Sequence, residues 1–360
     1  MNAESANSSA ATVPYPSFVD SQKLDQAVER IAQALLDGRA HFLLGAGMSK
    51  DSGIPLGYDL ATKLLAQYFP AAGNPPSQKQ LAELAKEYSL ETIATAVEAM
   101  PGMGRADLTT KLQQILFQNA KGFQEQHTQL ASLCFWDGYQ RVTQLFTTNL
   151  DTLLEDAFGK KSRSVGHEDD TEIERAQIKG LIPIIHLHGK LDGQYEITEA
   201  DVFRETPQRM HLRFELALGE AEAFVFVGYS LSDPDFRSIY RRYREGILKR
   251  PCGSTRKDKT TYVVGPQDDR HKYTLGADIW LDRGAIWIPL TAHDFFARLR
   301  EFLEHKIGTR DLETLQNKYR IEDAKAFSQK VARIADILCL EREEALGFMM
   351  DARMVSGGAR

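Results

Sequence analysis

The chain has 360 residues, of which 42% are hydrophobic and 26% are charged. These fractions are close to those of soluble globular proteins, and they exclude collagen-like, coiled-coil and wholly disordered classes. With 44 basic and 50 acidic residues the net charge is −6, so the composition shows no signature of general nucleic-acid binding.

Three further features limit the class of protein. The longest apolar runs, such as residues 223–228, are far shorter than the ~20 residues that a membrane helix needs, so no membrane span is expected. The first residues lack the cationic start and apolar middle of a secretory signal, and we expect a cytoplasmic protein. Cys134, Cys252 and Cys339 are too widely spaced for a Cys-x-x-Cys pair, which predicts reduced thiols and no metal site.

The sequence pattern of the first half of the chain predicts mainly helices and one buried strand. Residues 1–18 are rich in Ser, Ala, Asn and Pro, which predicts a disordered tail. Helical spacing over 24–36 precedes a compact apolar strand at 40–44 and returns at 57–69. The patterns at 80–88, 90–100, 105–120 and 123–133 then predict a mainly helical insertion at about 70–140.

Strand patterns alternate with helical ones through the second half. They occur at residues 141–146, 182–187, 223–227, 261–264 and 285–288. This alternation predicts an α/β fold with a Rossmann-like, doubly wound parallel sheet. We expect one domain over residues 19–306 and a C-terminal helical extension over 307–360, which caps the domain or mediates self-association. The basic segment 248–259 is expected to be a solvated loop, with a nucleic-acid contact as the alternative.

A pair of glycines follows the first strand. Gly45-Ala46-Gly47 stands at a strand-to-helix turn, where main-chain N–H groups can approach a phosphate; a tight turn alone would also explain it. Lys50 occupies the position of the third glycine in the dehydrogenase fingerprint, which weakens a hydride-transfer reading.

Polar residues also end the second and third strong strands. Asn149 and Asp151 follow one of them, and either could instead cap the next helix. His186 and His188 end the other, where period-two alternation puts them on one side and a proton-accepting role competes with a structural one.

The fourth strand ends in Gly228 and Ser230, which are placed to line the same crevice. The residues that follow them, Leu231 and Ser232, do not complete a nucleophile elbow, so we exclude a hydrolase triad.

The ordered set of motifs resembles the sirtuin family over roughly residues 35–290. It comprises Gly-Ala-Gly-x-Ser…Ser-Gly-Ile-Pro (45–55), Thr-x-Asn-x-Asp (147–151), His-Gly (188–189) and Gly-x-Ser (228–230). The resemblance implies the sirtuin fold and a reaction that cleaves the nicotinamide–ribose bond of NAD+. It implies that Asn149 and His188 are catalytic. The implied NAD+-binding residues are Gly45, Ala46, Gly47, Ser49, Ser52, Asp151, Gly228 and Ser230.

Two departures refine the resemblance. No cysteine lies between His188 and Gly228, where sirtuin deacylases carry a four-cysteine zinc ribbon. Pro55 is followed by Leu-Gly-Tyr instead of the deacylases' Asp-Phe-Arg. The pattern is closer to the zinc-free bacterial sirtuin-like proteins of antiphage defence, which implies an NAD+ hydrolase, a homo-oligomer, and a partner defence protein or phage-derived trigger. A zinc-free deacylase or ADP-ribosyltransferase and a non-catalytic nucleotide-sensing subunit are the alternatives.

Overall fold

The computed structural model describes residues 21–69, 75–166, 170–202, 209–229, 236, 238–243, 260–266 and 285–304. The chain divides into two units, Met1–Arg300 and Glu301–Arg360, and the sheet lies in the first. The predicted tail, the basic loop 248–259, Ser230 and the C-terminal extension lie outside the described residues. The domain boundary expected near residue 306 therefore stays a prediction.

Seven parallel strands form one sheet in the order β3-β4-β2-β1-β5-β6-β7. The order without the edge strand β3 is that of the doubly wound dinucleotide-binding fold, in which the first strand lies at the centre and the chain winds outward on both sides. The Rossmann-like α/β prediction is thereby confirmed. The strands are β1 (Ala40–Leu44), β2 (Leu145–Thr147), β3 (Ser162–Val165), β4 (Ile182–His186), β5 (Ala223–Val227), β6 (Thr260–Val264) and β7 (Ala285–Ile288).

Burial explains which strands the sequence pattern finds. Every residue of β1, β4 and β5 is buried, as expected where helices cover both faces of a parallel sheet. The predicted strands 40–44, 223–227 and 285–288 have the observed bounds. In contrast, β2 starts four residues later than predicted, and the N–H of Arg141 bonds instead to the carbonyl of Cys134. The edge strand β3 was missed, because only Val165 among its four residues is buried.

The helices follow the predicted spacing. Those of the region between β1 and β2 are α2 (Gly57–Tyr68), α3 (Gln78–Glu87), α4 (Leu90–Glu98), α5 (Arg105–Phe117) and α6 (Glu125–Cys134). The others are α1 (Ser21–Leu36), α7 (Leu153–Phe158), α8 (Asp170–Ile178), α9 (Glu199–Val202) and α10 (Arg209–Glu220). Serine side chains start two of them: Ser77 forms a capping box with Gln80, and the Ser89 hydroxyl accepts the N–H of Thr92. None of the described helices has the length and apolar character needed to cross a membrane.

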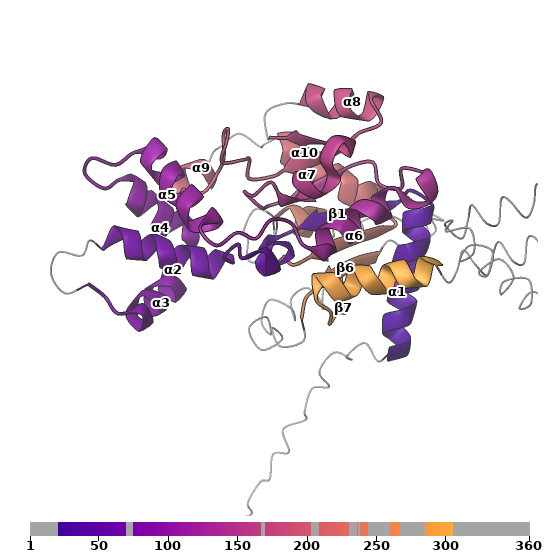
Figure 1. Cartoon of the computed structure of the whole chain (residues 1–360), viewed down its shortest axis with the longest axis horizontal. Coiled ribbons are helices and arrows are strands. Elements are labelled where there is room, and N and C mark those ends of the chain that lie inside the picture. The colour runs from indigo at the N-terminus through magenta and orange to yellow at the C-terminus, as the bar shows by residue number, and fades with distance from the viewer. Residues whose placement is uncertain are drawn as a thin grey trace, which may run out of the picture. The chain divides into compact units, whose positions relative to one another are not determined.

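Helices α2 to α5 have a hydrophobic core of their own. Figure 1 shows them gathered beside the sheet. Their core includes Leu64, Ile93, Val97, Leu108 and Leu112, and it also contains Leu191, Tyr195 and Ile197 from the segment after β4. The helical insertion is thus confirmed, and it packs against a segment that leads directly from a strand end.

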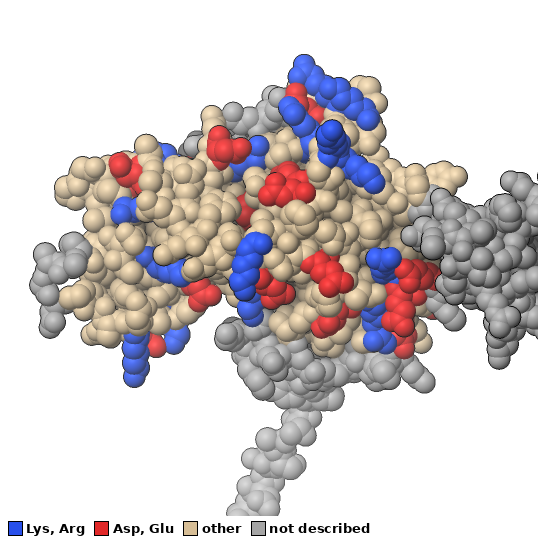
Figure 2. All heavy atoms as spheres, in the orientation of Figure 1, with Lys and Arg blue, Asp and Glu red and all other residues tan. Residues whose placement is uncertain are grey.

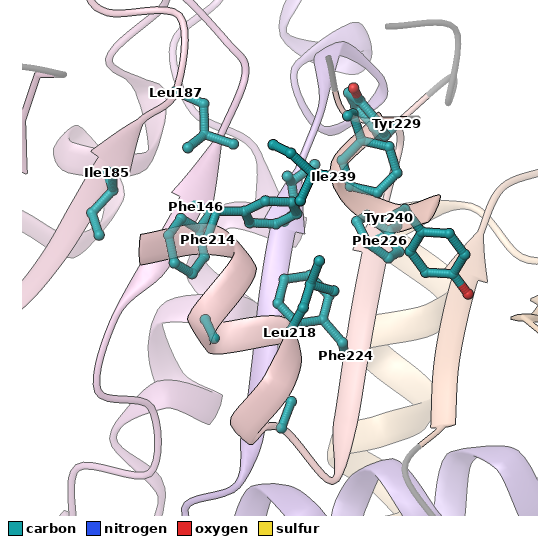
Figure 3. Close-up of a cluster of buried hydrophobic side chains, with 14 of the residues drawn as sticks. Phe146, Ile185, Leu187, Phe214, Leu218, Phe224, Phe226, Tyr229, Ile239 and Tyr240 are labelled. Carbon is teal, nitrogen blue, oxygen red and sulfur yellow. The ribbon is translucent and has the colours of Figure 1, made fainter. Parts of the chain in front are cut away.

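A second core lies between α10 and the sheet (Figure 3). The ring of Phe214, on α10, meets Phe146 at a centroid distance of 5.3 Å and Phe224 at 5.4 Å, both edge-to-face. Such pairs add about 0.5–1.5 kcal/mol each to the stability that comes from buried area. This packing holds β2 and β5, on either side of β1, against one helix.

Candidate active site

The strand register brings three chain segments together at the carboxyl edge of the sheet. Leu44, the last residue of β1, pairs with Thr147 on one side and Val227 on the other. After β1 the chain crosses to β2 on one side, and β5 returns on the other side, so this is the topological switch point of the sheet. Doubly wound sheets bind ligands in the crevice outside such a point. Gly45 and Gly228 are the first residues beyond it.

The glycines are required by contact between these two strand ends. The N–H of Gly45 donates to Val227 O at 3.0 Å, and that of Gly47 donates to Gly228 O at 2.8 Å. A Cβ at Gly45 would lie 2.7 Å from Gly228 O, and one at Gly47 would lie 2.7 Å from the Cα of Gly228. Gly228 itself has φ +62°, which disfavours other residues. The tight-turn explanation of the Gly-x-Gly pattern therefore holds here.

The loop has few main-chain donors left for a phosphate. The N–H groups of Met48 and Ser49 donate to Gly45 O and Ala46 O within a short helical turn at Ala46–Met48. Ala46 begins that turn, where an N–H has no partner within the turn itself. Of the predicted phosphate-binding loop, Ala46 is thus the residue with the most suitable main-chain donor.

Asn149 is buried and held by two side chains. Its N–H donates to the hydroxyl of Thr147 at 3.0 Å, and its Nδ2 donates to the hydroxyl of Ser49 at 3.1 Å. Its Oδ1 is buried and has no hydrogen-bond partner among the described residues, and the same is true of the hydroxyl of Ser52. A buried amide oxygen left without a donor costs about 1–3 kcal/mol. These two atoms fit a ligand rich in hydroxyl groups, such as the riboses of a dinucleotide.

Asp151 lies just before Thr152, the N-cap residue of helix α7. Its Oδ1 accepts the N–H of Leu153, the first residue of the helix, at 3.1 Å, so it supports the start of the helix without being its N-cap. Burial raises the pKa of Asp151 above its ordinary value, although the hydrogen bonds from Leu153 and Ser49 act in the opposite direction. Ser49 therefore links the first strand end to both polar residues of the second.

His186 is fully buried and bridges two groups. Its Nδ1 lies 2.9 Å from the carbonyl oxygen of Asn149, and its Nε2 lies 2.6 Å from Oε1 of Glu155. Since a carbonyl oxygen only accepts, Nδ1 carries a proton. Burial alone would raise the pKa of Glu155, but the hydrogen bond and charge of His186 outweigh burial and lower it. His186 and Glu155 thus form a partly buried hydrogen-bonded pair behind Asn149, and His186 has a structural role.

His188 lies on a turn beyond the end of β4. The alternation expected to place it on the same side as His186 does not apply, because the strand ends at His186. Thr147 pairs with His186, so Asn149 and His188 each lie two residues past the last pair of neighbouring strands. The His188 side chain is half-buried, and its carbonyl accepts the N–H of Glu196 at 2.8 Å. The register therefore places the two predicted catalytic residues at adjacent strand ends.

Another part of the chain has a hollow of its own. A cavity of about 360 Å³ lies at the amino end of β4, at the opposite end of that strand from His188. Figure 2 shows Lys and Arg gathered over α8, the helix on this side. Glu172 neutralises two of the cations through ion pairs with Arg163 and Arg175. The cavity is lined by Arg163, Glu172, Arg175, Ala176, Lys179 and Leu181.

Comparison with known proteins was made for families, curated sequences and solved structures. Residues 143–279 match the family model of the SIR2-like domain. This stretch of the chain is similar to a SIR2-like domain. This match spans β2 to β6 and includes Asn149, Asp151, His186 and His188. The match to this family model confirms the sirtuin-like resemblance. Comparison with curated protein sequences gives no match.

Solved Sir2 structures are similar at 16% identity. One Sir2 enzyme covers 78% of this chain and 99% of its own, with a TM-score of 0.43. Sir2 in complex with an inhibitor, 2′-O-acetyl-ADP-ribose and a deacetylated p53 peptide covers 76% and 97%, with a TM-score of 0.36. A Sir2 histidine-to-alanine variant with a deacetylated p53 peptide and 3′-O-acetyl-ADP-ribose covers 76% and 97%, with a TM-score of 0.41. The fold assignment of this chain rests on its strand order and not on these overall similarities.

Sequence reasoning missed several residues that hold the site together. Glu155 stands four residues after Asp151, in the first turn of α7, a spacing that could have pointed to it. Thr147 ends its strand beside Leu44 and joins it through a hydroxyl-to-carbonyl bond of 3.0 Å. The contacts of Arg105 with the segment after β4 leave no local pattern in the sequence.

Proposed function

We propose that this SIR2-like protein is an NAD+ glycohydrolase, which converts NAD+ and water to nicotinamide and ADP-ribose. The observation that carries the proposal is Asn149, held by Ser49 at the switch point with its Oδ1 buried and available. His188 stands at the neighbouring strand end, in the register that a shared site needs.

In this proposal, one group of residues binds NAD+ and another takes part in cleavage of the bond. The Gly45 loop, with Ala46, Ser49 and Ser52, binds the diphosphate and adjoining ribose, and Gly228 lines the other side. The Oδ1 of Asn149 accepts a hydrogen bond from the attacking water or a ribose hydroxyl. As the bond between nicotinamide nitrogen and ribose carbon breaks, water adds to that carbon and His188 takes its proton. Nicotinamide leaves as a neutral molecule, so no acid and no metal is required.

The test is direct product analysis of the purified full chain. Nicotinamide and ADP-ribose are measured after incubation with NAD+, for wild type, Asn149→Ala and His188→Ala. A general base contributes roughly 10²- to 10⁴-fold, and we expect losses of that size, with the melting temperature of His188→Ala retained. The control is His293→Ala, an exposed histidine on the surface. Full activity in His188→Ala would refute the assignment.

The products also separate the other activities. A zinc-free deacylase would transfer an acyl group to ADP-ribose, and an ADP-ribosyltransferase would leave ADP-ribose on a protein. A nucleotide-sensing subunit would bind NAD+ without releasing nicotinamide. Both Asn149 and His188 argue for turnover, because binding of the diphosphate needs neither.

The biological role we propose is depletion of NAD+ in bacterial antiphage defence, in the cytoplasm. Uncontrolled NAD+ loss would harm the host, so we propose a homo-oligomer that is activated by a partner defence protein or a phage-derived trigger. The helical insertion or the C-terminal helices would gate the site. Size measurement in solution and turnover with and without candidate triggers test this role.

A further inference from the structure

The segment that follows His188 is held by the helical insertion. This segment, residues 188–202, is called the His188 loop below. The loop contacts α4 through Glu199. The Glu199 carboxylate accepts a hydrogen bond from the hydroxyl of Thr92 at 2.6 Å, and the Glu199 N–H donates to the hydroxyl of Thr95 at 2.9 Å. Leu191, Tyr195 and Ile197 belong to the hydrophobic core of the insertion. The His188 loop therefore follows directly from a strand of the sheet in the sequence, and its side chains pack in the core of the helical insertion.

Arg105, the first residue of α5, makes the strongest polar contacts to the loop. Its Nη2 lies 2.6 Å from the carbonyl oxygen of Tyr195 and 2.7 Å from Oδ2 of Asp201. Its guanidinium lies 4.4 Å from the centroid of the Tyr195 ring, within cation–π range. One turn later on α5, the Thr109 hydroxyl is 2.8 Å from the hydroxyl of Tyr195. Two positions of one helix thus fix the ring, the carbonyl and the hydroxyl of Tyr195.

Asp201 gathers the rest of the loop around Arg105. Its Oδ2 accepts the N–H groups of Ile197 and Thr198 at 3.1 and 3.0 Å, and the hydroxyl of Thr198 at 2.8 Å. Burial alone would raise the pKa of Asp201, but these hydrogen bonds and that of Arg105 lower it, so the carboxylate is charged. Charge-assisted hydrogen bonds are about twice as strong as neutral ones. Without Arg105, the buried carboxylate would lose its cation.

The other end of the His188 loop leads to His188 itself. Tyr195 bridges to Gly189, which has φ +71°, and the next residue, Glu196, donates its N–H to His188 O at 2.8 Å. Tyr195, which Arg105 holds, therefore pairs with the residue after His188, and its neighbour Glu196 bonds to His188 itself. A shift of Tyr195 would be passed directly to the His188 turn.

We propose that Arg105 is a positioning residue that couples the helical insertion to His188. The inference rests on the proposed function in that His188 is the base. It goes further in naming the contact through which movement of α4 and α5 would align or release that base. Arg105 does not touch the reacting atoms; it acts through Tyr195 and Asp201.

The experiment compares wild type, Arg105→Ala, Arg105→Lys and Lys86→Ala in the full chain. Lys86 is the matched control, because it forms a surface ion pair within the insertion. Each protein is measured for kcat and KM with NAD+, and for amide hydrogen exchange over residues 189–201. For Arg105→Ala we expect kcat to fall by up to about 10²-fold, the size typical of a small misplacement, while KM changes little. Amide exchange of Glu196, Ile197 and Thr198 should become faster, and Arg105→Lys should lie between.

The two arms separate failure of this inference from failure of the proposed function. Unchanged amide exchange in Arg105→Ala overturns the coupling, whatever the activity. Faster exchange with unchanged kcat also overturns it, because the loop would then move without affecting the base. If wild type releases no nicotinamide, the glycohydrolase proposal fails, and with it the claim that Arg105 positions a base. If Arg105→Ala does not fold, Arg105→Lys, which keeps the charge but loses the planar fork, supplies the same comparison.

Discussion

The imidazole of His186 joins the carbonyl oxygen of Asn149, 2.9 Å from Nδ1, to the carboxylate of Glu155, 2.6 Å from Nε2. His186, the last residue of β4, thereby fixes the main chain at Asn149, just beyond the end of the neighbouring strand β2. Because the Asn149 side chain is held separately by Ser49, both halves of this residue are fixed before any ligand binds. Fixing of this kind lowers the cost of orienting a substrate.

Replacing His186 by Ala should destabilise the fold. It would leave the Glu155 carboxylate and the Asn149 carbonyl without the imidazole that bonds to both, and each such group left unsatisfied costs about 1–3 kcal/mol. Urea unfolding should show a loss of about 3 kcal/mol, with reduced nicotinamide release from the folded fraction. Asp156→Asn, an exposed change on the same helix, is the control. Wild-type stability in His186→Ala would show that the bridge contributes nothing.

Glu155 should make stability depend on acid pH. Its pKa in the fold is below the ordinary 4.5, so its carboxylate favours the folded state. That contribution is complete above about pH 4.5 and is lost as the pH falls through the folded pKa. Glu155→Gln should therefore lose most stability relative to wild type near neutral pH, and the difference should shrink on acidification. Asp151, whose pKa is raised, acts with the opposite sign in both proteins. Urea unfolding across this pH range measures the difference, and one that grows toward acid pH contradicts the prediction.

Gly47→Ala should disrupt the contact between the two strand ends. The added Cβ would lie 2.7 Å from the Cα and 2.9 Å from the carbonyl oxygen of Gly228, and neither backbone atom can move freely. Overpacking of this kind costs about 1–3 kcal/mol. Gly219→Ala on α10, where no atom lies within 4 Å, should instead gain about 0.5–1 kcal/mol. Thermal unfolding of the two variants should shift in opposite directions; equal shifts would exclude steric contact as the cause.

Ser49 and Asn149 should not act independently. Ser49→Ala removes the acceptor of the Asn149 Nδ2 group and leaves that buried donor unsatisfied, at a cost of about 1–3 kcal/mol. The double variant with Asn149→Ala should lose less stability than the two single losses added, by at least ~0.5 kcal/mol. A double-mutant cycle of urea unfolding measures this coupling. Full additivity would mean that the 3.1 Å hydrogen bond between Asn149 Nδ2 and Ser49 does not stabilise the fold.

How much of this fold can be predicted from the sequence depends on burial. The strands β1 and β5 are apolar throughout because both faces are covered, and this leaves a pattern that is easy to read. The edge strand β3 has a single buried residue, Val165, and no such pattern. The short β2 was predicted too long because Arg141, which looks like part of a strand, bonds instead to Cys134 and Leu36.

The candidate site was predicted where it depends on strand ends and was missed where it depends on contacts across the fold. Asn149 and Asp151 follow a strand directly, so a parallel sheet must bring them to its carboxyl edge. The His-Gly motif singles out His188, but only the register, with Glu155 on the adjacent helix, shows that His186 bonds to neighbouring groups inside the fold. Arg105 meets Asp201 from almost a hundred residues away, a distance that no short motif spans.

The central place of β1 has a consequence for synthesis on the ribosome. Leu44 finds its two neighbouring strands roughly 100 and 180 residues later, a long-range pairing that forms slowly. Until residue 228 has been added, Gly45 and Gly47 lack the carbonyls that hold them. A growing chain therefore carries its whole helical insertion before the contact between Gly47 and Gly228 can form, so the proposed dinucleotide site is completed late in synthesis.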